Sequence, residues 1–142
     1  MNAWGSRSLE VRAGLCAPLI KLVDAVLVVQ DCSLLDGIRS DEQQAIEKAE
    51  GRSDLGPGES KHNTRPSQAV DMVPYPVIWP ESEPVDSRER ELIWYRLYMF
   101  AGIVRAVAFQ LDIVIRQGVD WDGDLMFNDQ KFFDAPHVEV IL

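Results

Sequence analysis

Residues 88–110 constrain the fold most, because they have the pattern of one long helix. Apolar side chains recur there at intervals of three and four, and Ser87 can cap the first turn. We predict that this face is core; its members are Leu92, Tyr95, Met99, Ile103, Val107 and Leu111. Packing explains its aromatic residues better than a cofactor site does. The length of 142 residues suits one compact domain, residues 1–142, that contains this helix.

Shorter elements flank this helix. Residues 9–30 have helical spacing, with Pro18 predicting a kink or break. Ser40 and Gln43 resemble the start of a second helix over 41–50. Residues 51–66 and 75–84 are rich in loop-forming residues, and strands are predicted at 32–38, 68–73, 113–116 and 137–141. The order helix, strand, helix, strand, helix, strand, strand predicts an α+β domain with a small, mostly antiparallel sheet flanked by helices.

Charge and composition exclude several classes of function. The net charge is −9 and lysines and arginines do not cluster, which argues against nucleic acid as a partner. The longest strongly apolar run, residues 25–29, is far too short for a membrane span, so no membrane insertion is expected. Cys16 and Cys32 are too few for a disulfide framework and are interpreted as buried thiols. Residues 1–10 lack the features of a signal peptide, which predicts a cytoplasmic protein.

The sequence contains two histidines, and each lies within ten residues of a carboxylate. His62 precedes Asp71, and His137 lies near Asp134 and Glu139. Hydrolytic zinc sites use three nitrogen or oxygen ligands and leave one position for water. A single histidine of this kind is more often exposed or a satisfied polar group. Asp71 lies in an apolar strand and needs a partner if buried, which a metal or Arg39 could supply.

Three motifs in this order resemble the M15 (LAS-type) zinc peptidases, which include phage L-alanyl-D-glutamate endopeptidases and D-Ala-D-Ala carboxypeptidases and dipeptidases. The motifs are Gly37-Ile38-Arg39-Ser40 with Gln43, Ser60-Lys61-His62 leading to Ala69-Val70-Asp71, and Asp134-Ala135-Pro136-His137-Val138-Glu139. The resemblance implies a Hedgehog/D,D-peptidase-like fold. It also implies that His62, Asp71 and His137 bind Zn²⁺. In that comparison Asp134 is the general base, Arg39 stabilises the oxyanion and Gln43 is a substrate contact.

Two departures from the motif pattern affect the expected geometry. Eight residues separate His62 from Asp71, more than the family usually has, so the intervening loop is expected to bulge. Ala135-Pro136 stands where two glycines are common before the last histidine, which fixes the backbone beside Asp134 more tightly.

The resemblance predicts an enzyme that cleaves the stem peptide of bacterial peptidoglycan, at the L-Ala-D-Glu bond, as a phage endolysin. Such an endolysin is expected to be a monomer that stays in the host cytoplasm until a holin gives it access to the cell wall. Two alternatives remain open at this point. One is a D-Ala-D-Ala carboxypeptidase or dipeptidase of the same fold, and the other is a non-catalytic wall-binding or virion structural module.

Other polar residues carry weaker signals. Asp120, Asp122 and Asp124 alternate as in a calcium loop, but Leu125 and Lys131 stand where an EF-hand needs Gly and Glu, so a solvated acidic loop is predicted. Ser60 is interpreted as a residue that hydrogen-bonds near the metal site.

Overall fold

A computed structural model describes residues 1–81 and 86–142. The elements within them are α1 (Ser6–Ala13), α2 (Ala17–Val29), β1 (Cys32–Asp36), α3 (Asp41–Ala49), the 3₁₀ helix η1 (Lys61–Asn63), β2 (Ala69–Pro74), α4 (Ser87–Gln110), β3 (Ile115–Gln117) and β4 (His137–Val140). This is the predicted order, with the first helix divided in two and η1 added. The end of the predicted proline-rich connection, including Pro84, lies outside the described residues.

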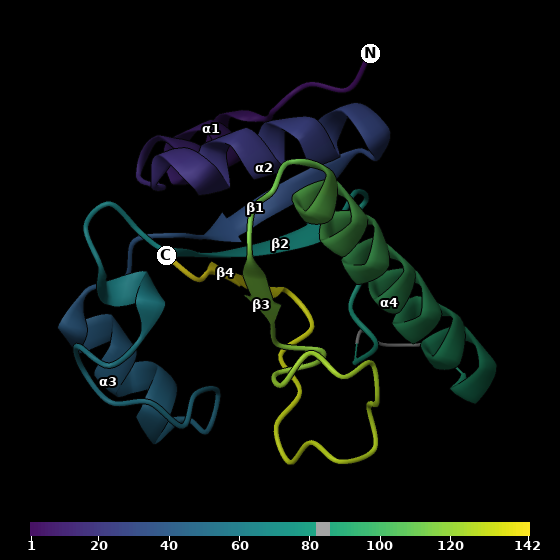
Figure 1. Cartoon of the computed structure of the whole chain (residues 1–142). Coiled ribbons are helices and arrows are strands. Elements are labelled where there is room, and N and C mark those ends of the chain that lie inside the picture. The colour runs from purple at the N-terminus through teal and green to yellow at the C-terminus, as the bar shows by residue number, and fades with distance from the viewer. Residues whose placement is uncertain (82–85) are drawn as a thin grey trace.

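The four strands form one antiparallel sheet in the order β1-β2-β4-β3, which confirms the predicted α+β class. In Figure 1, α1 and α2 lie above the sheet and α4 lies beside it. Helix α3 and the loop between β3 and β4 lie below the sheet and are separated from each other. The sheet is thus covered by helices on one side, whereas the space between α3 and the loop remains on the other.

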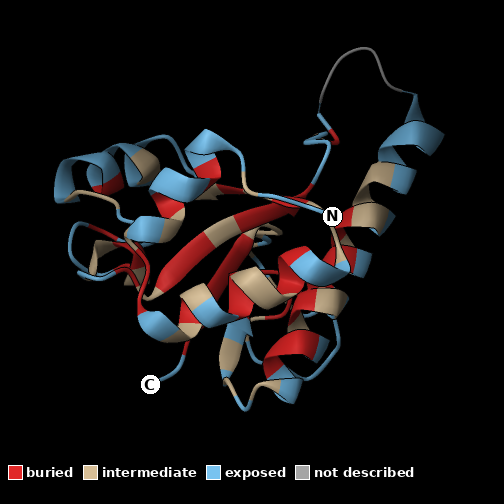
Figure 2. Ribbon diagram, turned by 90° about the horizontal axis from the view of Figure 1, so that it is seen from above, coloured by how far each residue is buried: buried red, intermediate tan, exposed pale blue. Residues whose placement is uncertain are grey.

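Side chains alternate along the strands, so one face of the sheet is apolar and the other is polar. Val70, Met72, Val138 and Val140 belong to the hydrophobic core, together with buried residues of α2 and α4. The intervening residues of β2 and β4 include Asp71, His137 and Glu139, which therefore point to the opposite face. Figure 2 shows the buried strands as red bands beneath the helices.

The first helix breaks before Pro18, at residues 14–16. The backbone of Cys16 donates to Ser67 O at 2.9 Å, and Ser67 N donates to Gly14 O at 2.9 Å, so the break pairs with the chain just before β2. Pro18 lies in the first turn of α2, where its missing N–H breaks no helical hydrogen bond. Cys16 is the residue just before α2, at its N-cap position, and lies outside both helices. Both cysteines are buried free thiols, as predicted, and burial raises the pKa of Cys32 to about 12.

Helix α4 forms as predicted, but the face assigned to its N-terminal half is wrong. Leu92, Tyr95 and Met99 are 54%, 56% and 61% exposed. The buried face is a neighbouring one, formed by Leu97, Phe100, Ala101, Val104, Val107 and Ala108. The N-terminal half of α4 projects from the body of the molecule, which Figure 2 shows in blue and tan beside the grey trace. The side chains of the predicted stripe there are exposed to solvent rather than packed in the core.

The ends and composition of α4 add two observations. Its cap is Asp86, whose side chain accepts from Glu89 N in a capping box, rather than Ser87. Its 24 residues include an 18-residue window with a mean hydropathy of 1.4, long and apolar enough to cross a membrane; a third of that window is buried against the domain. Core helices of soluble proteins have the same composition, and the expectation of no membrane insertion stays a prediction.

Candidate metal centre

Two strands hold Asp71 and His137 directly opposite each other. They are paired residues in the antiparallel ladder between β2 and β4. On the same face, Asp36 of β1 is paired with Asp71, and Arg116 of β3 is paired with Glu139. The face of the sheet opposite the core therefore carries a row of ionisable side chains that crosses all four strands.

His62 reaches this row from η1. Ser60 caps η1 through a capping box with Asn63, and its hydroxyl accepts from His62 N at 3.2 Å. The carbonyl of His62 accepts from Arg39 N at 2.8 Å, which joins η1 to the segment after β1. In the loop between His62 and Asp71, Gln68 N donates to Thr64 Oγ1 at 2.8 Å, and the bulge expected there relative to the family stays a prediction. Ser60 thus fixes the backbone of His62, in line with its predicted role.

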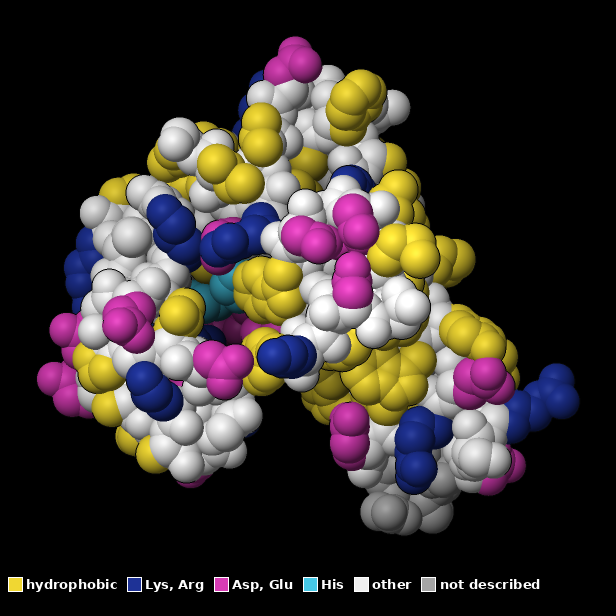
Figure 3. Space-filling model, turned by 60° about the horizontal axis from the view of Figure 1, so that its bottom comes forward, with side chains coloured by type: hydrophobic (Ala, Val, Ile, Leu, Met, Phe, Trp, Pro, Cys, Tyr) yellow, Lys and Arg dark blue, Asp and Glu magenta, His cyan; other side chains and the backbone are white. Residues whose placement is uncertain are grey.

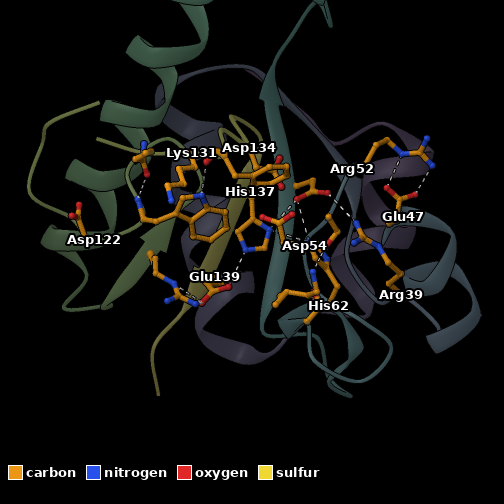
Figure 4. Close-up of a pocket in the computed structure, with 18 of the residues that line it drawn as sticks. Arg39, Glu47, Arg52, Asp54, His62, Asp122, Lys131, Asp134, His137 and Glu139 are labelled. Carbon is orange, nitrogen blue, oxygen red and sulfur yellow. Dashed lines mark hydrogen bonds and ion pairs between the residues drawn. The ribbon is translucent and has the colours of Figure 1, made fainter. Parts of the chain in front are cut away.

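Atoms of three side chains converge in this region, and Figure 4 labels the two histidines among them. Nε2 of His62 lies 3.2 Å from Oδ1 of Asp71 and 3.3 Å from Nδ1 of His137. Nδ1 of His137 lies 3.4 Å from Oδ1 of Asp71. Ligand atoms about 2.0–2.1 Å from a tetrahedral zinc ion are separated from each other by about 3.3 Å. The structure therefore brings together the predicted ligand set with the spacing that zinc needs.

The outer nitrogens of both imidazoles have acceptors. Nδ1 of His62 donates to Gly37 O at 2.6 Å, and Nε2 of His137 donates to Glu139 Oε2 at 2.9 Å. In their neutral forms, both rings therefore direct an unprotonated nitrogen toward Oδ1 of Asp71. Three acceptors this close repel one another unless a cation lies between them. A proton can bridge only two of these atoms, whereas a metal ion can bind all three.

Asp71 has both of the partners that its sequence position suggested. Oδ1 faces the histidines, and Oδ2 forms an ion pair with Nη2 of Arg39 at 3.5 Å. Arg39 also donates to Asp36 Oδ2 at 2.9 and 2.6 Å and to Gln44 Oε1 at 3.0 Å. A metal and Arg39 are thus complementary rather than competing partners of this carboxylate.

The pKa values of Asp71 and His137 reflect how closely these groups are packed. Burial alone would raise the pKa of Asp71, but the charges and hydrogen bonds of His62 and His137 lower it well below its ordinary value. Burial lowers the pKa of His137, but its hydrogen bonds with Asp71 and Glu139 outweigh this effect and raise it to about 9. The site thus attracts a positive charge strongly.

Asp134 is also close to this group. Burial, followed by the negative charge of Asp71, raises the pKa of Asp134 to about 6. Its backbone is held at both ends: Asp134 N donates to Gly118 O, and His137 N donates to Asp134 O, each at 3.0 Å. The Ala135-Pro136 segment lies within this turn. A carboxyl group with a pKa near neutrality beside a metal site can both accept and return a proton.

A cavity of about 740 Å³ opens over these side chains. Figure 3 shows histidine at the bottom of a hollow whose rim carries side chains of both charges. His62, Asp71, Asp134, His137 and Arg39 all line it.

The predicted site residue Gln43 does not line this cavity. Its side chain instead accepts from Ser40 N at 2.9 Å and closes the cap of α3. The neighbouring Gln44 is the residue that faces Arg39. The substrate contact expected of Gln43 therefore stays a prediction.

Comparison with known proteins gives a family and a solved structure to which this chain is similar. A sequence model of one family, described as phage L-alanyl-D-glutamate peptidase, matches residues 2–141. The chain belongs to this family. The L-Ala D-Glu endopeptidase ChiX from Serratia marcescens has the same fold, with a TM-score of 0.69 and 23% sequence identity over 96% of this chain and 87% of that chain. No curated protein matches the sequence.

Membership in the phage L-alanyl-D-glutamate peptidase family confirms the resemblance found in the motifs and makes the chain a peptidoglycan endopeptidase. Within this peptidase, Glu139 is the functional residue that sequence reasoning left without a role. Glu139 is buried, accepts from His137 and pairs through Oε1 with Arg116 at 2.6 Å. Its position two residues after His137 on one strand was the available signal, because such residues share a face.

Two further residues support this peptidase site from β3 and the loop after it. The guanidinium of Arg116 lies 5.5 Å from the ring centre of Trp121, and the ring of Trp121 lies 5.2 Å from that of His137. The indole Nε1 of Trp121 donates to Phe132 O at 2.9 Å. Trp121 thus packs near His137 and is itself held by Arg116 and the backbone of Phe132. No local sequence pattern predicts these contacts.

The acidic loop of this peptidase is only partly solvated. Asp122 and Asp124 are exposed, as predicted, whereas Asp120 is buried and pairs with Arg105 at 2.8 Å. The three carboxylates lie close enough together to hold an ion. Asp120 also accepts from Gly123 N and Leu125 N, so the described contacts already account for its position.

Proposed function

We propose that this endopeptidase depends on zinc, cleaves the L-Ala-D-Glu bond of the peptidoglycan stem peptide and acts as a phage endolysin. The observation that carries the proposal is the convergence of His62, Asp71 and His137 with mutual atom distances of 3.2 to 3.4 Å. The proton on each outer ring nitrogen leaves the inner nitrogens free to bind a metal. The description of the family and the name of ChiX support the choice of bond.

The donor set suits zinc, because two imidazole nitrogens and one carboxylate oxygen leave a fourth position open. Zinc bound by these three residues would lower the pKa of a water molecule and polarise the scissile carbonyl. Arg39 would hold the second oxygen of Asp71, and Glu139 would hold the outer nitrogen of His137. Both ligands are thereby fixed in the orientation that the structure shows.

Asp134 would move the proton during hydrolysis. Its carboxylate accepts a proton from the attacking water while the water oxygen bonds to the carbonyl carbon of L-Ala. It then returns the proton to the nitrogen of D-Glu as the C–N bond breaks, which releases an amine and a carboxylate. The raised pKa of Asp134, about 6, suits both transfers near neutral pH.

Arg39 would stabilise the negative charge that develops on the carbonyl oxygen, as the resemblance implies. Four of its five N–H groups are accounted for by the described contacts with Asp36, Asp71 and Gln44. One N–H on Nη1 remains for this purpose among the described residues. Its pairing with the two carboxylates also keeps the guanidinium in the cavity wall.

The decisive experiment combines metal analysis with cleavage of defined stem peptides. We expect about one zinc per chain by mass spectrometry, and products that end at L-Ala and begin at D-Glu. Chelation should abolish cleavage, and added zinc should restore it. Release of D-alanine alone would support the carboxypeptidase alternative instead of the endopeptidase. Asp134→Ala should keep zinc and lose cleavage; absence of both metal and cleavage in the wild-type protein would favour a non-catalytic module.

We also propose that the protein acts as a monomer and stays in the host cytoplasm until a holin opens the membrane. Membership in a family of phage peptidases supports this order of events. Expression in the cytoplasm of a susceptible host should leave cells intact until the membrane is permeabilised, and lysis should follow at once. Lysis without permeabilisation would contradict the proposed dependence on a holin.

A further inference from the structure

A second groove, which four aromatic side chains help to line, adjoins the metal cavity. Its volume is about 340 Å³, and Trp79, Trp94, Phe132 and Phe133 form much of its wall. Arg52, Phe132 and Asp134 line both this groove and the metal cavity. The two spaces thus adjoin each other, and Asp134, the residue proposed to move the proton, lines both.

Hydrogen bonds between distant parts of the chain hold the walls of the groove. Arg90 Nε and Arg96 Nη1 of α4 donate to Pro80 O and Pro76 O, at 3.0 and 2.8 Å, and so fix the segment that carries Trp79. On the opposite wall, the indole of Trp121 donates to Phe132 O at 2.9 Å. Trp94 stacks on Tyr98, with ring centres 5.9 Å apart. The aromatic surface is therefore tied to α4 and to the loop before β4.

The two adjoining spaces differ in chemistry. The metal cavity is lined by charged side chains of both signs, such as Asp54 and Lys131. These suit the charged and polar groups of a peptide. The groove has aromatic faces with Arg52, Glu81 and Asp134 at its edge. Flat apolar faces next to a few polar groups suit a pyranose ring, whose C–H faces pack on aromatic rings while its hydroxyls bond at the rim.

We propose that this aromatic groove is a sugar subsite, which binds the N-acetylmuramyl residue that carries the stem peptide. The inference rests on the proposed cleavage of the L-Ala-D-Glu bond. In that substrate the sugar is joined through its lactyl group to the nitrogen of L-Ala. Chain units extend about 3.5 Å each, so the sugar lies within roughly 10 Å of the scissile carbonyl. A groove that begins at Asp134 is placed to receive it.

The test compares two substrates that differ only in the sugar. One is an N-acetylmuramyl tetrapeptide, and the other is the same tetrapeptide with a lactyl group in place of the whole muramyl residue. The variants are Trp79→Ala and Phe133→Ala; Phe133 is 40% exposed, so its truncation should not disturb folding. The matched control is Phe109→Ala, which removes an aromatic side chain that is 83% exposed and lies outside both spaces. Thermal melting checks that each variant is folded.

We expect the wild-type protein and Phe109→Ala to cleave the muramyl substrate with a kcat/KM about tenfold above that for the lactyl peptide. In Trp79→Ala and Phe133→Ala, kcat/KM for the muramyl substrate should fall by roughly tenfold, so that most of the preference is lost. Both variants should cleave the lactyl peptide at the wild-type rate. Equal rates on both substrates in the wild-type protein would overturn the subsite. Equal loss on both substrates in the folded variants would overturn it as well, because that pattern fits a groove for the peptide.

Failure of the wild-type protein to cleave either substrate would contradict the proposed function. In that case a binding measurement tests the sugar subsite independently of cleavage. Calorimetric titration with N-acetylmuramyl-L-alanine should give binding that Trp79→Ala and Phe133→Ala weaken and Phe109→Ala preserves. Absence of binding, or binding that neither groove variant weakens, would overturn the proposal.

Discussion

Gly118 and Asp134 touch through their backbones so closely that no side chain fits between them. A Cβ atom on Gly118 would lie 2.2 Å from Asp134 O and 2.8 Å from Asp134 Cβ. Gly118 N also donates to His137 O, and Asp134 N donates to Gly118 O, both at 3.0 Å. The position of the proposed proton carrier thus depends on the absence of a side chain in the neighbouring loop.

Gly118→Ala should therefore impair cleavage by displacing Asp134 while the metal ligands stay in place. We expect kcat to fall by roughly 100-fold, because small misplacements of a reacting group have effects of this size. Zinc affinity, measured by competition with a chelator, should change little. Gly102→Ala is the matched control, since a Cβ there meets no atom within 4 Å and the helix should be slightly stabilised. Unchanged kcat in Gly118→Ala would contradict the role of Asp134.

Glu139→Gln should weaken zinc binding without touching a ligand. The substitution keeps the size of the side chain but removes the negative charge that holds His137 Nε2 and Arg116. We expect a loss of zinc affinity of about tenfold or more, the usual effect of removing such a partner. Titration of the metal-free protein in a competing chelator measures it. The control is Glu91→Gln on the exposed part of α4; an equal loss in both variants would argue against a specific effect.

Zinc should stabilise the fold through the same ligands. At a free zinc concentration of 100 times Kd, the free energy of unfolding should rise by about 2.7 kcal/mol, which corresponds to an increase in Tm of roughly 5–10 °C for a domain of this size. Differential scanning calorimetry of the metal-free and loaded protein measures the shift. His137→Ala should abolish both the shift and the cleavage of stem peptides. A full thermal shift in that variant would remove His137 from the ligand set.

The ion pair between α1 and α2 predicts a pH dependence of stability. Hydrogen bonds from Arg12, at 2.7 and 2.5 Å, and then from Trp4 lower the pKa of Asp24 in the folded protein. Because the folded pKa lies below the unfolded value, the stabilisation is present above the ordinary aspartate pKa of about 3.9 and is lost as the pH falls through the folded pKa.

Urea unfolding of Asp24→Asn tests this dependence. After allowance for screening by solvent, we expect the variant to be about 1 kcal/mol less stable than the wild-type protein at pH 7. The difference should shrink as the pH falls below about 4. A constant difference across this range would mean that the charge of Asp24 does not contribute.

Much of the site could be predicted because its signals are local. The Ser40 and Gln43 capping pattern, the alternation around Asp71 and the order of the three motifs are all readable along the chain. The family resemblance carried by those motifs named His62, Asp71 and His137 as one ligand set, and the structure brings these three residues together.

Features that depend on distant contacts could not be predicted in the same way. Helical spacing in α4 offers two adjacent apolar faces, and the choice between Leu92 and Leu97 depends on where the sheet lies. The partnership of Arg116 with Glu139 depends on the register between β3 and β4. The break of the first helix before Pro18 likewise depends on pairing with Ser67.

The division of the sheet into a polar and an apolar face limits how this enzyme can change during evolution. Inserting or deleting one residue within β2 or β4 would turn Asp71 or His137 into the core and expose a core valine in its place. Such a change would remove catalysis and folding in one step. Changes in chain length are easier to accommodate between the strands, and the long His62–Asp71 spacing adds its extra residues there, before β2 begins at Ala69.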